Sequence, residues 1–189
     1  MISERQDESV ATPWTSARYS GLPYGVEVLP APTARLRFRQ MTEADLRDLA
    51  TLELGGSRSP AWWIEWTRRN YEKHGFGLWV IETHTGEFVG DCGLTMQEVE
   101  GEWFVEAGWH VRSPLQRQGY ASEAAAAVRT AAAAAGIEHL IAIIRPTNVA
   151  SQRVATKIGL TLEREVHKNG GPALVFGADL RSDELRQIQ

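Results

Sequence analysis

A glycine turn that runs straight into an alanine-rich segment is the feature that most limits what this sequence can fold into. The segment reads RSPLQRQGYASEAAAAV and covers residues 112–128. Alanine loses no side-chain entropy on entering a helix, so a helix is predicted over 119–135. The start of a helix presents backbone N–H groups without internal partners and the positive end of the helix dipole. Because Gly119 and Ala121 are small, the segment predicts a site that a phosphate group can approach.

A single glycine before a helix is weak evidence for such a site, because an ordinary connection between a strand and a helix is a commoner explanation. The segment has no Gly-Lys-Ser/Thr sequence, as a Walker loop would, and no G-x-G-x-x-G pattern. Both absences disfavour a nucleotide-binding protein of either type. If phosphate does bind, Arg117 could add a charge-assisted contact.

The rest of the chain alternates between predicted helices and strands in the order β-α-α-β-β-β-α-β-α-β-β. Thr42 and Asp45 resemble a capping pair that starts the first helix, which is predicted to end at Gly55-Gly56. Ser59 and Gly75 fit the cap and the end of the second helix. Alternating or short apolar runs predict strands at 34–40, 77–83, 88–99, 102–111, 139–145, 160–168 and 173–180.

Length and composition indicate one folded domain with short tails. The 189 residues are 43% hydrophobic, which is enough for a sizeable core. We predict an N-terminal tail over 1–32, a folded domain over 33–182 and a C-terminal tail over 183–189. The formal net charge of −4 disfavours a nucleic-acid binder, which usually has a basic surplus, and fits a small cationic partner more easily.

Cysteine and histidine usage predicts neither disulfides nor a metal site. Cys92 is the single cysteine, and the five histidines are scattered without ligand spacing. The first ten residues carry charges where a signal peptide needs an apolar run, and no stretch has the apolar length of a membrane span. We therefore expect a cytoplasmic protein that uses no metal and binds neither membrane nor nucleic acid.

Three segments in the correct order make the chain resemble the GNAT superfamily of acyl-CoA-dependent N-acyltransferases, and within it the branch of ribosomal-protein N-terminal acetyltransferases. They read TARLRFRQMTEADLRDL, VEAGWHVRSPLQRQGYASEA and RPTNVASQRVATKIGLTLE. The resemblance covers roughly residues 33–180. It implies the GNAT fold, an α/β (α+β) fold with a mixed, mostly antiparallel central sheet flanked by helices. It also implies an enzyme that moves an acetyl group from acetyl-CoA to a primary amine.

The resemblance places the co-substrate acetyl-CoA along the glycine turn and the strand before it. In the family the backbone amides of this loop hold the pyrophosphate of CoA, and the end of the preceding strand pairs with pantetheine. Asn148 matches an asparagine that reaches the pantetheine arm, and Arg117 stands where the family often has glycine or an aromatic residue. The expected cofactor-binding residues are Trp109, His110, Val111, Gln116, Arg117, Gln118, Gly119, Tyr120, Ala121, Ser122 and Asn148.

Glu106 is the candidate general base, because an amine attacks a thioester only in its neutral form. The period of two in a strand puts Glu106 on one face with Gly108 and His110. In the resembling branch a glutamate at this position points toward the acceptor amine, whereas the alternative is a solvated residue or an ion pair. A neutral His110 could share the proton transfer, although a packed histidine is commoner.

Ser151 is the candidate that donates a hydrogen bond or a proton to the leaving thiolate, a role that the resembling branch gives to a serine at this position. The alternative is a hydroxyl that satisfies the backbone at a helix start. Trp63 and Trp66 are candidate acceptor contacts, because this segment forms part of the acceptor wall in the family, although helical spacing of tryptophans more often indicates core. Cys92 is interpreted as a buried small hydrophobic residue.

Two functions remain open from the sequence. The first is an acetyl-CoA-dependent N-acetyltransferase that works by direct attack in a ternary complex, and the second is a non-catalytic CoA-binding or regulatory module. Glu106 and Ser151 favour the first, since a silent module has no need of them. The acceptor could be a protein N-terminus or a small-molecule amine, and the protein could be a monomer or a homodimer.

Overall fold

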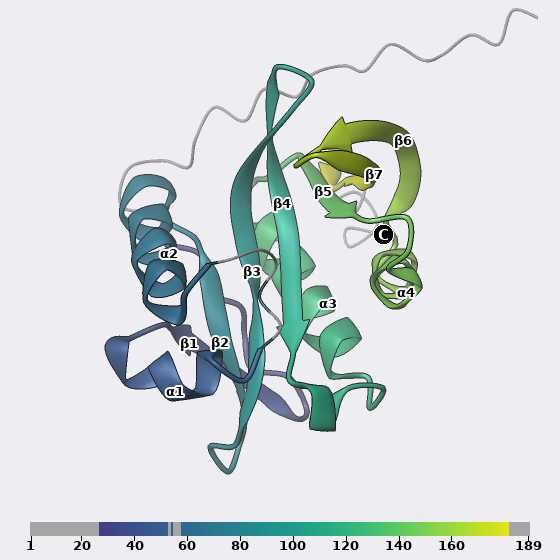
Figure 1. Ribbon diagram of the computed structural model, residues 1–189. Coiled ribbons are helices and arrows are strands. Elements are labelled where there is room, and N and C mark those ends of the chain that lie inside the picture. The colour runs from purple at the N-terminus through teal and green to yellow at the C-terminus, as the bar shows by residue number, and fades with distance from the viewer. Residues whose placement is uncertain (1–26, 53, 55–57, 182–189) are drawn as a thin grey trace, which may run out of the picture.

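The computed structural model describes residues 27–52, 54 and 58–181. Their strands form a seven-stranded sheet in the order β1-β2-β3-β4-β5-β7-β6 (Figure 1). Neighbouring strands are antiparallel except for β4 and β5, which run parallel. The strands are β1 (Leu36–Gln40), β2 (Leu78–Thr83), β3 (Phe88–Val99), β4 (Glu102–Val111), β5 (His139–Ile144), β6 (Thr161–Lys168) and β7 (Gly171–Asp179).

The helices begin and end largely where the local sequence predicts. Ser59 caps α2, because its hydroxyl accepts the backbone N–H of Trp62 at 3.2 Å, and Gly75 ends it with a left-handed φ of 73°. The first helix is shorter than predicted, and its expected end at 55–56 lies outside the described residues. The helices are α1 (Leu46–Leu49), preceded by a 3-10 turn (Glu43–Asp45), then α2 (Pro60–His74), α3 (Tyr120–Ala134) and α4 (Val149–Lys157).

Helices cover both faces of the sheet, as the mixed α/β expectation requires (Figure 1). On one face, Trp63 and Ile64 of α2 pack with Leu49 of α1 against the strands. On the other face, the buried alanines and Val128 of α3 pack against β3, β4 and β5. The small alanine side chains let α3 approach the sheet closely. No helix in this part of the chain is long and apolar enough to cross a membrane.

The end of the predicted N-terminal tail packs onto the domain. Val28 is buried, and its N–H donates to the carbonyl of Gly75 at 2.8 Å. The structure thus describes contacts for part of the segment 1–32, whereas residues 1–26 and 182–189 lie outside it. The proposed tail boundaries stay predictions.

The parallel pair β4–β5 is paired over a short length only. Val105 aligns with Leu140 and Glu106 with Ile141, whereas β4 continues to Val111 and β5 to Ile144. The two strands therefore separate after Glu106. This separation positions the site described next.

Candidate active site

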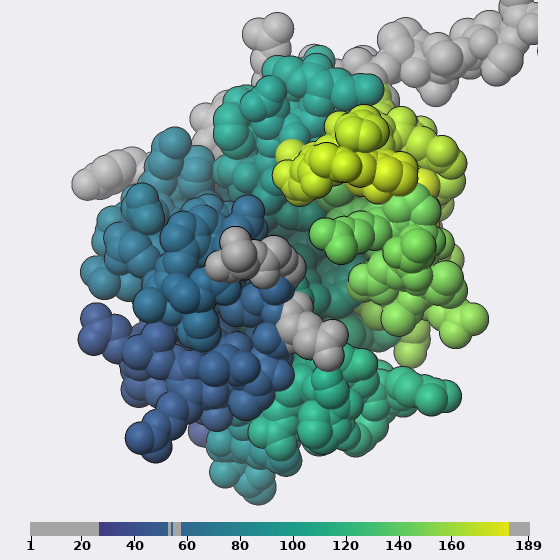
Figure 2. Space-filling model, viewed as in Figure 1, coloured from purple at the N-terminus to yellow at the C-terminus, as the bar shows by residue number. Residues whose placement is uncertain are grey.

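A cavity of about 520 Å³ opens where β4 and β5 separate. Its walls come from α2 on one side and from the end of β5 and the start of α4 on the other, with β3 and β4 between them. Figure 2 shows the surface hollowed between the blue and the green segments. The predicted site residues that line it are Trp63, Trp66, Glu106, Trp109, His110, Asn148 and Ser151.

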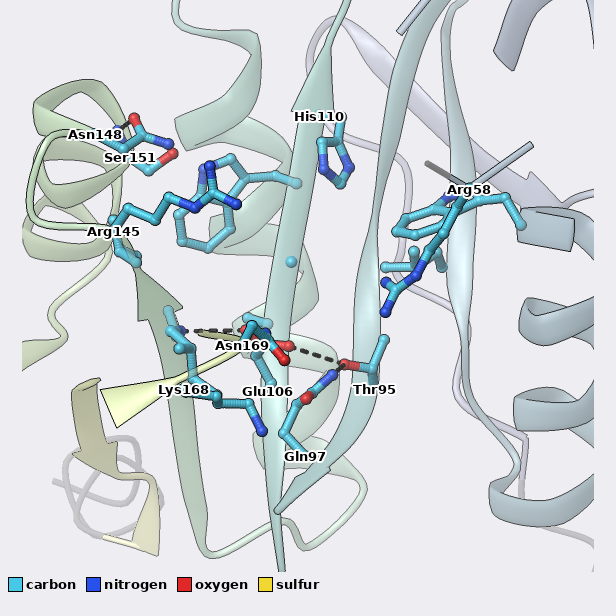
Figure 3. A pocket seen from close by; sticks show the side chains of 18 of the residues that line it. Arg58, Thr95, Gln97, Glu106, His110, Arg145, Asn148, Ser151, Lys168 and Asn169 are labelled. Carbon is cyan, nitrogen blue, oxygen red and sulfur yellow. Dashed lines mark hydrogen bonds between the residues drawn. The ribbon is translucent and has the colours of Figure 1, made fainter. Parts of the chain in front are cut away.

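The carboxylate of Glu106 lies at the point where the two strands part. Its Oε1 accepts the backbone N–H of Ile143 at 3.2 Å, and its Oε2 accepts the hydroxyl of Thr95 at 3.1 Å (Figure 3). The side chain thus supplies an acceptor to a β5 amide after β4 has turned away. Burial raises the pKa of Glu106, and the two hydrogen bonds offset this only in part. A raised pKa makes a carboxylate a stronger base for a substrate proton.

His110 is held by a buried carboxylate that the sequence analysis did not single out. Asp91 on β3 has no exposed surface, and its Oδ1 lies 2.8 Å from Nδ1 of His110. Its Oδ2 accepts the indole N–H of Trp63 at 2.9 Å. Burial alone would lower the pKa of His110, but the charge and hydrogen bond of Asp91, with the charge of Glu106, raise it above its usual value. Both oxygens of Asp91 therefore fix the side chains around the cavity.

Asp91→Asn is expected to lower the pKa of His110, because it removes the nearest negative charge while keeping the side-chain shape. The charged groups facing His110 are Asp91 and Glu106, and its neighbour from α2 is the neutral Trp63, with ring centroids 5.6 Å apart. NMR titration of the imidazole measures the shift. An unchanged titration midpoint in the variant would contradict this account of His110.

Asp91→Asn should also change how the free energy of unfolding depends on pH. A raised folded-state pKa means that protonation of His110 stabilises the fold. That contribution is complete below the unfolded pKa of about 6.5 and disappears as pH rises through the folded pKa. The stability difference between wild type and Asp91→Asn should therefore be largest below about pH 6 and smallest at alkaline pH. Denaturant unfolding across this range measures it.

Gly108 leaves the strand face between Glu106 and His110 open. It lies in the cavity lining, between these two residues on β4. A Cβ added there would contact only the side chain of Leu78, at 3.7 Å. Packing therefore does not require glycine at this position. The missing side chain leaves room for a small group over the strand, within reach of both titratable side chains.

Asn148 and Ser151 meet at the start of α4, on the wall opposite α2 (Figure 3). Oδ1 of Asn148 accepts the backbone N–H of Ser151 at 3.1 Å and so caps the helix. The capping role that the sequence left open for Ser151 thus belongs to Asn148. Within the described residues, no hydrogen bond joins the Ser151 hydroxyl to a protein group. That hydroxyl is free to act on a bound molecule.

The predicted phosphate loop follows β4 and lies beyond the cavity lining. Gly119 caps α3 with a left-handed φ of 86°, and Arg117 also has a positive φ, of 63°. Such values favour glycine because a Cβ is strained there. The first N–H groups of α3 have no carbonyl partner within the helix. The turn thus has the helix-start geometry that the sequence predicts, at the end of the strand that leads out of the cavity, and its binding of an anion stays a prediction.

Arg35 braces this loop from a distant part of the chain. Its Nη1 donates to the carbonyl of Gln118 at 3.0 Å, and its Nε donates to Glu123 of α3 at 2.6 Å. The guanidinium also lies 4.4 Å from the ring centre of Tyr120. The sequence analysis missed Arg35, because its partners are 83 and 88 residues away.

The remaining predicted residues lie as follows. Trp63 is buried and Trp66 is half-buried, with ring centroids 5.3 Å apart, and both line the cavity while packing in one core cluster. Their contact with an acceptor stays a prediction. Cys92 is fully buried, and burial raises its pKa, which agrees with a packing role. Among the residues that the structure describes, no group of three His, Cys, Asp or Glu side chains could hold a metal ion.

Comparison with known proteins gives consistent matches. The model of the acetyltransferase (GNAT) domain family matches residues 35–161. The uncharacterized protein YkkB of Bacillus subtilis (strain 168) is 32% identical over 158 residues, which cover 76% of this chain and 92% of YkkB.

Solved structures match over similar lengths. An acetyltransferase from Agrobacterium tumefaciens str. C58 is 28% identical, with a TM-score of 0.68, over 80% of this chain and 95% of its own. The ribosomal L7/L12 α-N-protein acetyltransferase RimL, in complex with coenzyme A, has a TM-score of 0.64 at 19% identity, over 81% of this chain and 98% of its own. At that identity the match to RimL shows the shared fold.

Proposed function

Because the chain belongs to the acetyltransferase (GNAT) family and is an acetyl-CoA-dependent acetyltransferase, we propose that it transfers the acetyl group to a primary amine held against Glu106. The observation that carries this proposal is the Glu106 carboxylate at the strand separation, with its raised pKa and its two fixed donors. The acceptor is either a protein N-terminus, as in the L7/L12 α-N-protein acetyltransferase RimL, or a small-molecule amine.

The residues present fit acetyl-CoA. The helix-start amides of α3 and the left-handed Gly119 give a phosphate close access to the backbone. Trp109 and His110 of the separated β4 would pair with pantetheine, while the Nδ2 group of Asn148 is left to donate because its Oδ1 is used in the cap. The bound thioester supplies the activated acetyl group. Arg117 is exposed, and its side chain could add a contact to phosphate.

Two side chains, Glu106 on β4 and Ser151 at the start of α4, would move the protons. Glu106 takes the proton that the amine nitrogen loses as it bonds to the acetyl carbon. The C–S bond breaks, and Ser151 donates its hydroxyl proton to the departing thiolate and is reprotonated from solvent. Asp91 keeps His110 oriented beside Glu106, where its charge would favour the ionised carboxylate. No covalent acetyl-protein intermediate is needed, so the transfer proceeds directly between two bound substrates.

Thiol release from acetyl-CoA across a panel of primary amines tests this function. An enzyme should release CoA thiol only when an acceptor is present, with the acetylated amine as second product by mass spectrometry. Binding of CoA without amine-dependent release would support the non-catalytic CoA-binding module instead. The open hydroxyl of Ser151 and the buried base favour the enzyme.

Ser151→Ala is expected to slow the chemical step about tenfold, because a hydrogen bond to developing negative charge is lost. CoA affinity and stability should stay close to wild type, since Asn148 and not Ser151 caps α4. Single-turnover kinetics and thermal melting on one sample measure both. Asn148→Ala provides the contrast, with an expected cost of about 0.5–2 kcal/mol in stability. A wild-type single-turnover rate for Ser151→Ala would reject its catalytic role.

A further inference from the structure

The cavity carries positive charge although the chain as a whole is negative. The chain has 20 Lys and Arg against 24 Asp and Glu. Among the described residues that line the cavity, Arg58, Arg145 and Lys168 are cationic, and Glu106 is the one carboxylate. The net charge suggested a small cationic partner at the level of sequence. The charges of the cavity lining instead favour a partner with an anionic group.

Arg58 and Lys168 lie on two different walls near Glu106. Arg58 directly precedes the cap of α2 and extends toward Thr95 and Gln97 (Figure 3). Its guanidinium lies 4.6 Å from the ring centre of Trp62, which holds its orientation without neutralising it. Lys168 ends β6 on the opposite side and reaches across to β3.

No carboxylate of the described residues forms an ion pair with these two side chains, although the charge of Lys168 acts on Glu106 and partly offsets the burial that raises the pKa of that carboxyl. Nζ of Lys168 donates to the backbone carbonyl of Glu98 at 2.5 Å, a neutral partner. Within the described ranges, no Asp or Glu lies at ion-pair distance from Arg58 or Lys168. The amides of Gln97 and Asn169 line the same end of the cavity and add neutral donors. An anion placed there would meet donors on several sides.

These two cations are separate from the expected CoA contacts. Arg145 lies beside Asn148 and Ser151 at the α4 wall, whereas Arg58, Gln97, Lys168 and Asn169 surround the end that contains Glu106 and Thr95 (Figure 3). The phosphates of CoA belong at the start of α3, which contributes no residue to the lining. The charge of Arg58 and Lys168 is therefore directed at the acceptor.

We propose that the acceptor is an amine that also carries a carboxylate or phosphate, with this anionic group bound between Arg58 and Lys168 while Glu106 receives the amine. The proposal rests on the acetyl transfer proposed above and adds the substrate class. A polyamine or aminoglycoside would bring a second cation against both side chains and be repelled. The class therefore comprises amino acids, amines with acidic substituents and amino phosphates.

Matched pairs of acceptors test the substrate class. Suitable pairs are alanine and alaninamide, aspartate and asparagine, and O-phosphoethanolamine and ethanolamine, with kcat/KM expressed per concentration of neutral amine. The charged member of at least one pair should be preferred about tenfold or more, as expected for hydrogen bonds to a charged group. The first two pairs report carboxylate recognition and the third reports phosphate. Equal use of both members in every pair, or preference for the uncharged ones, overturns the proposal.

Variants connect this preference to the two side chains. Lys168→Met and Arg58→Met should each reduce the preference for the charged acceptor about tenfold, mainly through KM. Lys73→Met, which removes one positive charge at the far end of α2, is the matched control and should keep the wild-type ratio. If Arg58→Met unfolds, Lys168→Met decides, and thermal melting reports folding in each case. A wild-type ratio in both folded cavity variants overturns the proposal.

Failure of this inference can be told apart from failure of the proposed function. If uncharged amines are acetylated as well as charged ones, the enzyme activity stands and only the substrate class is wrong. If none of the amines yields a product, the proposed transfer to an amine is itself at fault.

Discussion

Glu106→Gln is expected to lower kcat/KM by about 10²–10⁴-fold, the typical contribution of a positioned general base. Glutamine keeps the size of the side chain but cannot take a proton from the amine. Its carbonyl can still accept the N–H of Ile143, and its amide can donate to the Thr95 hydroxyl, which is able to accept. The change therefore removes the proton transfer and leaves the geometry in place.

The loss of kcat/KM in Glu106→Gln should depend on pH. Since burial raises the pKa of Glu106, wild-type kcat/KM should rise with pH as the carboxyl loses its proton. The variant lacks this limb, so its defect relative to wild type should be small below the pKa of Glu106, where the wild-type carboxyl is also protonated. The defect should be greatest just above that pKa and shrink again as rising pH supplies neutral amine. Steady-state rates across this range measure the effect. Glu102→Gln, at the exposed start of the same strand, is the matched control and should match wild type. A wild-type pH–rate profile in Glu106→Gln would remove Glu106 from the mechanism.

The same substitution should not cost stability. A carboxyl group whose folded-state pKa is raised binds more protons in the folded than in the unfolded state. Its effect on the free energy of unfolding therefore becomes less favourable as pH rises above its unfolded pKa of about 4.3. At neutral pH, Glu106→Gln should be at least as stable as wild type. If Glu106→Gln is inactive but as stable as wild type, its loss of activity comes from the missing base and not from a damaged fold.

Local sequence signals were sufficient for most of the fold and for the strand face of the site. Ser59 and Gly75 bound α2 because a hydroxyl and a left-handed glycine satisfy helix ends locally. The two-residue period put Glu106, Gly108 and His110 on one face, and all three line the cavity. The GNAT fold followed from the order of three segments, and the family match confirms it.

Contacts between distant segments could not be predicted in the same way. Trp63 and Asp91 meet across 28 residues, and Arg35 reaches Glu123 across 88, so no local pattern joins them. Asp91 did leave one signal, because it is a lone acid between glycines in the apolar strand FVGDCGL. A charge at such a position is buried, and a buried charge needs partners. Net charge failed as a guide to the cavity for a related reason: Arg58 and Lys168 are brought together only by the fold.

Gly119→Val is expected to weaken CoA binding at least about 100-fold, since hydrogen bonds to a charged group contribute about 1.5–3 kcal/mol each and more than one would be lost. The physical reason is twofold. A branched side chain at a φ of 86° strains the turn. Its Cβ would already be in van der Waals contact with Nη2 of Arg35 at 3.4 Å, so its methyl groups would have to fit beside the guanidinium that braces the loop. Both effects displace or cover the N–H groups at the start of α3.

The other end of the same helix provides the matched control for Gly119→Val. Gly136 follows α3 with a φ of 78°, and an added Cβ there meets nothing within 4 Å. Gly136→Val should therefore carry a similar backbone strain, about 1–2 kcal/mol, without touching the phosphate site. Calorimetry with CoA and thermal melting should show both variants destabilised and only Gly119→Val defective in binding. Unchanged CoA affinity in folded Gly119→Val would reject the loop at 116–122 as the pyrophosphate site. If phosphate bound at this turn, a β-branched residue there would have to obstruct it.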